Sequence, residues 1–204
     1  LELQDHTIFL AGDISDPHFV RRAFDLGRQR WGGPLRGVFH LAGSYHEAPL
    51  ASETAAGFVA ALHPKLAGAL ALNSIAQENP GCLFVNFSSL LGYFGAFGTG
   101  AYSAANAALD AFSANQRLFG INAYSLAWSM WQGTGMGRLV DGEVVKQRGF
   151  QILDPTAALQ LLDTVLGYPP GHYLIGLDPD GRAALGAGAT RVAGDEAADV
   201  PPAT

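Results

Sequence analysis

Short apolar runs alternate with longer amphipathic segments along most of the chain. The apolar runs that predict strands are residues 7–11, 37–41, 82–87, 123–128 and 173–177. Several of them are apolar at consecutive positions, as expected for parallel strands buried on both faces. The segments that predict helices are residues 17–31, 52–77, 100–119 and 155–166. This alternation predicts an α/β fold in which a doubly wound parallel sheet carries helices on both faces.

Local signals refine the helix boundaries. Asp-Pro dipeptides at 16–17 and 154–155 place a capping residue ahead of a proline at the first helical position. Pro64 removes a backbone donor inside the second helix and is expected to kink it. From about residue 181 the chain is rich in Ala, Gly, Pro and Asp. We therefore expect residues 1–180 to form one domain and residues 181–204 to be a linker or disordered tail.

Composition narrows the class of protein. The 204 residues carry a net charge of −6 without a basic patch, which argues against nucleic acid. The acidic N-terminus does not have the pattern of a signal peptide. Every apolar run of eighteen residues contains charges or frequent glycine, which argues against a membrane span. Cys82 is the single cysteine, which excludes an internal disulfide and fits a reducing cytoplasm. The six histidines show no metal-ligand spacing, so no metal site is expected.

Four polar residues form a candidate catalytic set. Tyr102 and Asn106 make a Tyr-x-x-x-Asn pentad, Ser89 lies thirteen residues before Tyr102, and Lys65 lies twenty-four before Ser89. A phenol can protonate a carbonyl oxygen, and a nearby ammonium is expected to lower its pKa toward the working range. A serine hydroxyl can orient the substrate oxygen. On a helix, Asn106 lies one turn beyond Tyr102, where it can bridge Lys65 or a proton-resupplying water.

Each of these residues alone is an ordinary polar side chain at a helix or strand end. Their combined spacing is what favours catalysis. Aromatic residues beside the glycine-rich stretch around 92–100 are open to two interpretations, a substrate wall or simply the edge of the core.

With these motifs the chain resembles the ketoreductase domains of modular polyketide synthases and of hybrid peptide–polyketide synthases. These domains are a branch of the short-chain dehydrogenase/reductases with a Rossmann-like fold. The matching stretches within about residues 5 to 180 are 34–43 (PLRGVFHLAG), 64–65, 87–89, 102–110 (YSAANAALD) and 126–131 (LAWSMW), running on to 135–136. In this branch asparagine replaces the lysine that usually follows the tyrosine, and the lysine comes from the preceding helix, as Asn106 and Lys65 do here.

The resemblance implies NADPH as cofactor and assigns residues to it and to the substrate. The implied catalytic residues are Lys65, Ser89, Tyr102 and Asn106. The implied cofactor-binding residues are Asp13, Ile14, Ala42, Gly43, Lys65, Tyr102 and Met130, with Asp13 and Ile14 at the adenine ring. The implied substrate-binding residues are Glu47, Phe94, Phe97, Trp131 and Met136. Tyr93 is expected in the same apolar lining.

The resemblance also implies an absent part. A dinucleotide fold opens with a strand, a glycine-rich turn and a helix, and nothing before Asp13 supplies that unit. By resemblance the chain starts at the third strand and lacks the first two, which leaves a long apolar sheet edge. Three explanations stay open: a fragment of a larger ketoreductase, a sequence that omits an upstream segment, and a half supplied by another polypeptide.

The stereochemical markers of the family are not present. The position of its Leu-Asp-Asp triplet reads Tyr45-His46-Glu47, and Phe94 stands where a tryptophan marks the other product configuration. The hydroxyl configuration is therefore open, as is an α-ketoacyl rather than a β-ketoacyl substrate.

We expect a cytoplasmic enzyme that reduces a ketoacyl group tethered to an acyl or peptidyl carrier protein. Its other partners would be the upstream half of the domain and further megasynthase domains, with neither nucleic acid nor membrane. The alternatives are a non-reducing structural or epimerising domain of a megasynthase, which the missing turn favours, and a fragment of a stand-alone short-chain reductase. The intact set of four residues favours the reductase.

Overall fold

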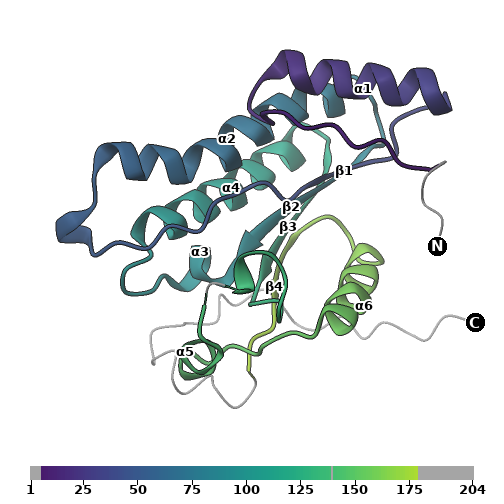
Figure 1. Cartoon of the computed structure of the whole chain (residues 1–204). Coiled ribbons are helices and arrows are strands. Elements are labelled where there is room, and N and C mark those ends of the chain that lie inside the picture. Colours follow the sequence, from purple (N-terminus) through teal and green to yellow (C-terminus); the bar gives the residue numbers. More distant parts are fainter. Residues whose placement is uncertain (1–5, 139, 179–204) are drawn as a thin grey trace, which may run out of the picture.

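One parallel sheet organises the molecule. The computed structural model describes residues 6–138 and 140–178, so the expected tail at 181–204 lies outside the described residues. The sheet has four strands in the order β1-β2-β3-β4, with every neighbouring pair parallel. These strands are β1 (Gly37–His40), β2 (Leu83–Ser89), β3 (Asn122–Trp128) and β4 (His172–Ile175). Their carboxyl ends therefore meet at one edge of the sheet (Figure 1).

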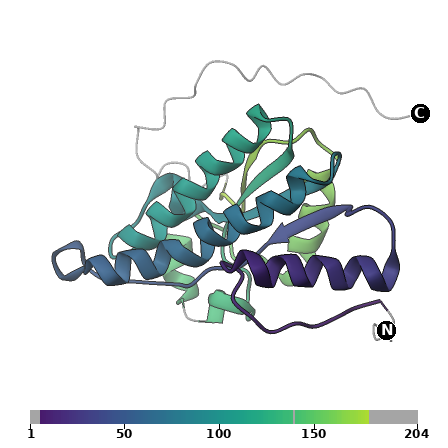
Figure 2. The same ribbon diagram turned by 90° about the horizontal axis from the view of Figure 1, so that it is seen from above.

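Helices cover both faces of this sheet. The helices α1 (Pro17–Trp31), α2 (Ala55–Gln77) and α4 (Gly100–Leu118) form one layer, which Figure 2 shows from above. On the opposite face lies α6 (Pro155–Leu166). The short helices α3 (Leu90–Phe94) and α5 (Gly142–Gln147), with 3-10 turns at Leu50–Ser52 and Gly135–Arg138, lie in the connections. This arrangement confirms the predicted doubly wound α/β fold.

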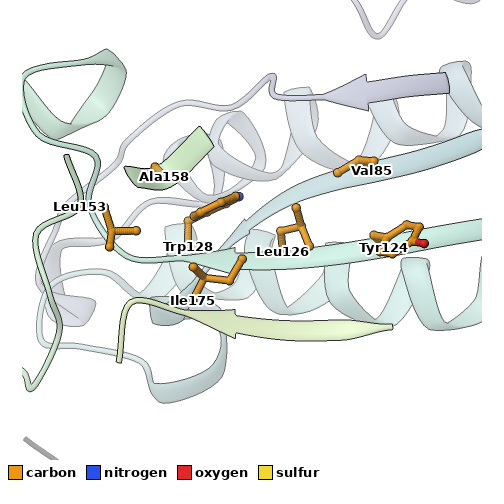
Figure 3. Packing of buried hydrophobic residues seen from close by; sticks show 7 residues of the cluster. All are labelled: Val85, Tyr124, Leu126, Trp128, Leu153, Ala158 and Ile175. Carbon is orange, nitrogen blue, oxygen red and sulfur yellow. The ribbon is translucent and has the colours of Figure 1, made fainter. Parts of the chain in front are cut away.

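The side chains of β2 alternate between these two layers. Phe84 packs with Ala76 of α2, and Asn86 donates to the side chain of Gln116 in α4. Val85 and Phe87 face the opposite way, toward the α6 cluster. Figure 3 shows the core of that cluster. Its buried members are Val85, Tyr124, Leu126, Trp128, Leu153, Ala158 and Ile175. Both faces of the sheet are therefore apolar, as the consecutive apolar positions predicted.

Capping side chains set the helix starts. Asp16 and Asp154 accept hydrogen bonds from backbone amides of the first turns of α1 and α6, as predicted. The helix expected from residue 52 begins instead at Ala55, because the Thr54 side chain accepts from the Gly57 amide at 3.0 Å. Ser52 belongs to the preceding 3-10 turn.

The strand expected at residues 7–11 is not formed, so that prediction is wrong. The segment is extended without strand pairing, and Ile8, Phe9 and Leu10 are 37%, 91% and 41% exposed. A strand is stable only when its backbone groups pair with a neighbour. Among the described residues no other strand lies beside this segment, so its β propensity alone does not make it a strand.

Within the described ranges, α2 is long and apolar enough to cross a membrane, by length and composition only. The sequence expectation concerned runs of eighteen residues free of charges or frequent glycine, and α2 contains Lys65, Gly57 and Gly68. The helix lies between α1 and α4 and over β1, and it carries the buried Lys65. It continues through Pro64 without interruption. Part of this helix is buried in the helical layer, whereas Val59 and Leu70 are exposed.

Candidate active site

The four predicted catalytic residues come from three elements that meet beside the carboxyl end of β2. Ser89 ends β2, Lys65 lies in the middle of α2, and Tyr102 and Asn106 occupy the first two turns of α4. All four side chains are buried. Lys65, Ser89 and Tyr102 line one cavity. The fold therefore brings together residues that span thirty-seven positions between Lys65 and Tyr102.

Ser89 has a hydroxyl that is only partly used. It caps α3, where its oxygen accepts a hydrogen bond from the Leu91 amide at 3.2 Å. A serine hydroxyl has one donor and two acceptor positions, so this cap leaves its proton for a partner in the cavity, which in this structure is the Tyr102 phenol. That proton can be donated to a carbonyl oxygen in the cavity.

The phenol of Tyr102 is 8% exposed, and burial raises its pKa. Hydrogen bonding with the Ser89 hydroxyl and the Asn106 side chain acts in the opposite direction but is the smaller effect. The sequence predicted that Lys65 would lower this pKa. In the structure desolvation dominates and the pKa is raised, so that part of the prediction is wrong.

Lys65 is 2% exposed, and its Nζ donates a 2.8 Å hydrogen bond to the Phe87 carbonyl. Burial lowers the pKa of Lys65 to about 8, and the charge of Asp110 acts in the opposite direction. A group with this pKa is still mostly protonated at pH 7. Gly43 lies directly against it, since a methyl group at Gly43 would be 3.0 Å from the Lys65 Cε. Glycine at this position lets the segment after β1 lie against the Lys65 side chain, which a methyl group would displace by a few tenths of an ångström.

Asn106 is fully buried and holds one unpaired atom. Its Nδ2 donates to the Tyr102 carbonyl at 2.8 Å, one helical turn back. Its Oδ1 is buried without a partner among the described residues. A buried acceptor without a partner is uncommon and calls for a donor such as an ammonium group or a water molecule. The Asn106 Oδ1 atom is therefore an acceptor that is open to such a donor.

The cavity has a volume of about 700 Å³ and mostly apolar walls. Of the predicted substrate and cofactor residues, Trp131, Met136 and Met130 line it. Glu47, Phe94 and Phe97 do not. Phe94 packs against Phe150, Phe97 is 86% exposed, and Glu47 accepts a hydrogen bond from Tyr45. Tyr93 is also outside the wall and 59% exposed.

Most of the other lining residues were not predicted, and Tyr45 and Arg148 are two polar examples. The ring of Tyr45 meets that of Tyr102 edge-on, with centroids 5.3 Å apart. Tyr45 is the first residue of the segment Tyr45-His46-Glu47, which replaces the family's Leu-Asp-Asp triplet, and that position could have marked it as a site residue. Arg148 follows α5, and no local pattern marks it as part of a site.

The residues expected at the cofactor lie in two places. Ala42 and Gly43 follow β1, with Gly43 against Lys65, and Met130 lies in the cavity wall. Asp13 and Ile14 lie in the loop before α1, where the Asp13 carboxylate accepts from the amide and hydroxyl of Ser15.

Residues 6–138 and 140–178 contain no site for the pyrophosphate of a dinucleotide, because no glycine-rich turn in them joins an opening strand to a helix. Among the glycines around 92–100, Gly92 serves packing instead, and Gly95 and Gly98 have positive φ values. A methyl group at Gly92 would be 2.8 Å from the Asn106 Cβ, so this glycine lets α3 approach α4 beside the relay residue.

Comparison with known proteins places this site in a family. A family model described as the KR domain matches residues 2–133, more than half of the chain. Pikromycin polyketide synthase component PikAIII of Streptomyces venezuelae is 36% identical over 158 residues, which cover 78% of this chain and 10% of that protein. 6-Methylsalicylic acid synthase of Penicillium terrestre is 35% identical over 163 residues, covering 78% and 9%.

Solved structures agree with this assignment. A-type ketoreductases from a modular polyketide synthase share 34% identity at a TM-score of 0.73, over 83% of this chain and 36% of theirs. A structure of adenylation, ketoreductase and pseudo-Asub domains from a keto acid-selecting peptide synthetase module shares 26% identity at a TM-score of 0.76, over 84% and 14%.

The chain belongs to the ketoreductase (KR) domain family of polyketide synthases, within the short-chain dehydrogenase/reductase superfamily. KR domains are oxidoreductases that use a nicotinamide cofactor. The chain spans about a tenth of the length of the two synthases and about a third of the A-type ketoreductase structure.

Proposed function

We propose that this chain is the catalytic part of a domain that reduces a ketoacyl group to a hydroxyacyl group with NADPH. The observation that carries the proposal is the convergence of Lys65, Ser89 and Tyr102 on one apolar cavity beside Asn106. In such a site, hydrogen bonds and charges act at low effective dielectric and are stronger than in water.

The residues have distinct roles in this reaction. Ser89 donates its hydroxyl proton to the ketone oxygen and holds it toward Tyr102. When bound, NADPH supplies a hydride to the ketone carbon. Tyr102 then gives its phenolic proton to the oxygen, which leaves a phenolate beside the protonated Lys65. Asn106 Oδ1 would accept a hydrogen bond from a water molecule or from Lys65, along which a replacement proton reaches Tyr102, so that one ketone, one NADPH and one proton give one alcohol and one NADP⁺.

We propose that the substrate is tethered to an acyl or peptidyl carrier protein in a cytoplasmic megasynthase. The named relatives are polyketide synthase components, which supports this setting. The apolar walls at Trp131 and Met136 suit an acyl chain. Both β-ketoacyl and α-ketoacyl thioesters are candidate substrates, the latter because of the likeness to the keto acid-selecting module.

A complementing segment is the second proposed partner. In the described residues β1 pairs only with β2, so its other edge has no hydrogen-bonded neighbour. Phe39 and Leu41 at that end of the sheet are 46% and 57% exposed. A strand with a glycine-rich turn and its helix, added along this edge, would cover them and supply the pyrophosphate site.

The complementing segment can be tested by titration. We expect the 204-residue chain alone to bind NADPH very weakly and to be poorly soluble, because the phosphate-binding turn is not among its described elements. A ketoreductase segment carrying that turn, added in cis or as a separate chain, should restore binding and solubility. Fluorescence titration with NADPH measures the difference. Micromolar binding by the chain alone would contradict this assignment.

Replacing the proton donor tests the reaction itself. In the complemented domain, Tyr102→Phe removes only a hydroxyl, so the fold should persist while turnover of ketone thioesters falls about 10²-fold or more. NADPH oxidation and product analysis report the rate. Near-normal turnover in the variant would exclude Tyr102 as the donor. A complemented wild-type domain that binds NADPH without reducing either ketone would instead favour a non-reducing or epimerising domain.

A further inference from the structure

We propose that His40 is a positioning residue that fixes the backbone of α2 at Lys65, so that the Lys65 ammonium is held in the cavity that also contains Tyr102. This inference rests on the proposed ketone reduction. It extends that proposal to a residue that belongs neither to the catalytic set nor to the cavity wall.

The imidazole of His40 is joined to Lys65 through the backbone of α2. His40 ends β1, is 1% exposed, and has its Nε2 atom 2.8 Å from the Lys65 carbonyl oxygen. A carbonyl oxygen can only accept, so the Nε2 atom carries the hydrogen and donates it. The second ring nitrogen, Nδ1, is buried without a partner among the described residues. The hydrogen bond to Lys65 is therefore the polar contact that holds this ring.

The turn of α2 that carries Lys65 has lost one of its own hydrogen bonds. Pro64 lies directly before Lys65 and has no backbone N–H. A carbonyl oxygen has two lone pairs, so that of Lys65 can accept from His40 in addition to an amide of its own helix. Gly68 leaves room for the ring, since a methyl group there would lie 3.0 Å from the His40 Cε1. The hydrogen bond from β1 therefore fixes α2 at the point where the helix is weakest.

The Lys65 side chain is held by the neighbouring strand at its other end. Its Nζ donates to the Phe87 carbonyl at 2.8 Å. His40 and Asn86 are partners in the register of β1 and β2, and Phe87 is the next residue along β2. Two adjacent strands thus hold Lys65 at its backbone carbonyl and at its ammonium. These two fixed ends determine how far the ammonium reaches into the cavity.

The groups around Lys65 leave His40 uncharged. Burial lowers the pKa of His40 to about 4, the hydrogen bond with the Lys65 carbonyl acts in the opposite direction, and the Lys65 charge lowers it further. From α4, the charge of Asp110 acts on Lys65, and Tyr102 faces the same cavity. At pH 7 the imidazole is therefore a neutral donor that does not repel the ammonium.

Substitutions at His40 separate the hydrogen bond from the bulk of the ring. His40→Gln keeps an amide donor at about the position of Nε2, whereas the amide of His40→Asn corresponds to Nδ1 and lies too far from Lys65. His40→Leu removes the donor, and His40→Asn takes its place where that variant does not fold. The matched control is Asn86→Leu, because Asn86 is the partner of His40 in the sheet, is fully buried, and donates at 3.0 Å to Gln116 instead of to Lys65.

The first measurement needs no cofactor. The chain has two lysines, Lys65 and Lys146, so lysine labelled with ¹³C at Cε gives two titrating NMR signals, and Lys146→Met assigns them. The labelled chain is measured alone or with an unlabelled complementing segment that keeps it soluble.

The expected change is in the titration midpoint of Lys65. Because burial lowers the pKa of Lys65 to about 8, loss of the tie in His40→Leu should let the ammonium reach solvent and raise its midpoint by about one pH unit or more. His40→Gln and Asn86→Leu should leave the midpoint within about 0.3 pH units of wild type. An unmoved midpoint in His40→Leu or its replacement, or an equal rise in Asn86→Leu, overturns the proposal.

The second measurement is turnover of the complemented domain in a double-mutant cycle. If His40 acts through Lys65, His40→Leu should lower kcat about 10–10²-fold in the wild-type background but less than about twofold in Lys65→Met. His40→Gln and Asn86→Leu should stay within about threefold of wild type. Additive losses in the double variant refute the proposal. If the wild-type domain reduces no ketone, the proposed function fails, and the titration of Lys65 still decides the role of His40.

Discussion

The substitution Lys65→Met isolates the contribution of a buried charge, because methionine is apolar and of similar length. The ammonium is 2% exposed, donates to the Phe87 carbonyl at 2.8 Å, and has a pKa lowered by burial to about 8. At pH 7 it is about nine-tenths protonated. The variant therefore removes a positive charge that is present during proton transfer from Tyr102.

The expected loss follows from the developing phenolate. At an effective dielectric constant near 20, opposite unit charges about 4–6 Å apart, the range over which an ion shifts a neighbour's pKa, attract by roughly 3–4 kcal/mol. This corresponds to a fall in turnover of about 10²–10³-fold. Stability should change by less, because the cost of an unpaired Phe87 carbonyl, about 1–3 kcal/mol, is offset by removing a buried charge.

Lys146→Met is the matched control. Lys146 pairs with Glu143 on the surface at 2.8 Å, and its side chain is 59% exposed, so turnover should stay within about twofold. Rates are measured as NADPH oxidation in the complemented domain, with urea unfolding as the check on stability. Wild-type activity should also fall as pH rises through about 8, when Lys65 loses its proton. Equal losses of turnover in the two variants would refute the role of Lys65. Wild-type turnover that does not decline as the pH rises through about 8 would refute it as well.

Two further predictions follow from the same structure. Burial lowers the pKa of His40 from 6.5 to about 4. Between these pH values the unfolded chain therefore binds more protons than the folded chain, and the free energy of unfolding falls as the pH drops, by up to about 3 kcal/mol. Urea midpoints should decrease from pH 7 to pH 4, less so in His40→Gln, and a constant wild-type midpoint would contradict this. Gly92→Ala should lower the free energy of unfolding by about 1–3 kcal/mol and reduce turnover, because the added methyl group would lie 2.8 Å from the Asn106 Cβ. Gly100→Ala, where nothing lies within 4 Å, should be tolerated, and equal stability of both variants would refute the packing role.

Much of the framework could be predicted from local chemistry. The apolar runs that became β1, β2, β3 and β4 were found within a few residues. Asp16 and Asp154 marked two helix starts, because a capping hydrogen bond joins residues two or three positions apart. The spacing of Tyr102 and Asn106 likewise places both on one helix face. These features depend on interactions within a few residues of the chain.

Other features depend on contacts between distant segments. Residues 7–11 have a strand composition, but strand formation requires a neighbouring strand. Phe94 and Phe97 have the composition of a substrate wall, yet one packs into the core and the other faces solvent.

The sequence by itself determined the α/β fold and singled out Lys65, Ser89, Tyr102 and Asn106 as the proposed catalytic set, because periodicity and spacing are local properties. Only the tertiary structure decided that burial raises the pKa of Tyr102 and that Tyr45 lies against its ring. Desolvation and ring contact depend on what the rest of the chain places around a side chain, and that arrangement exists only after folding.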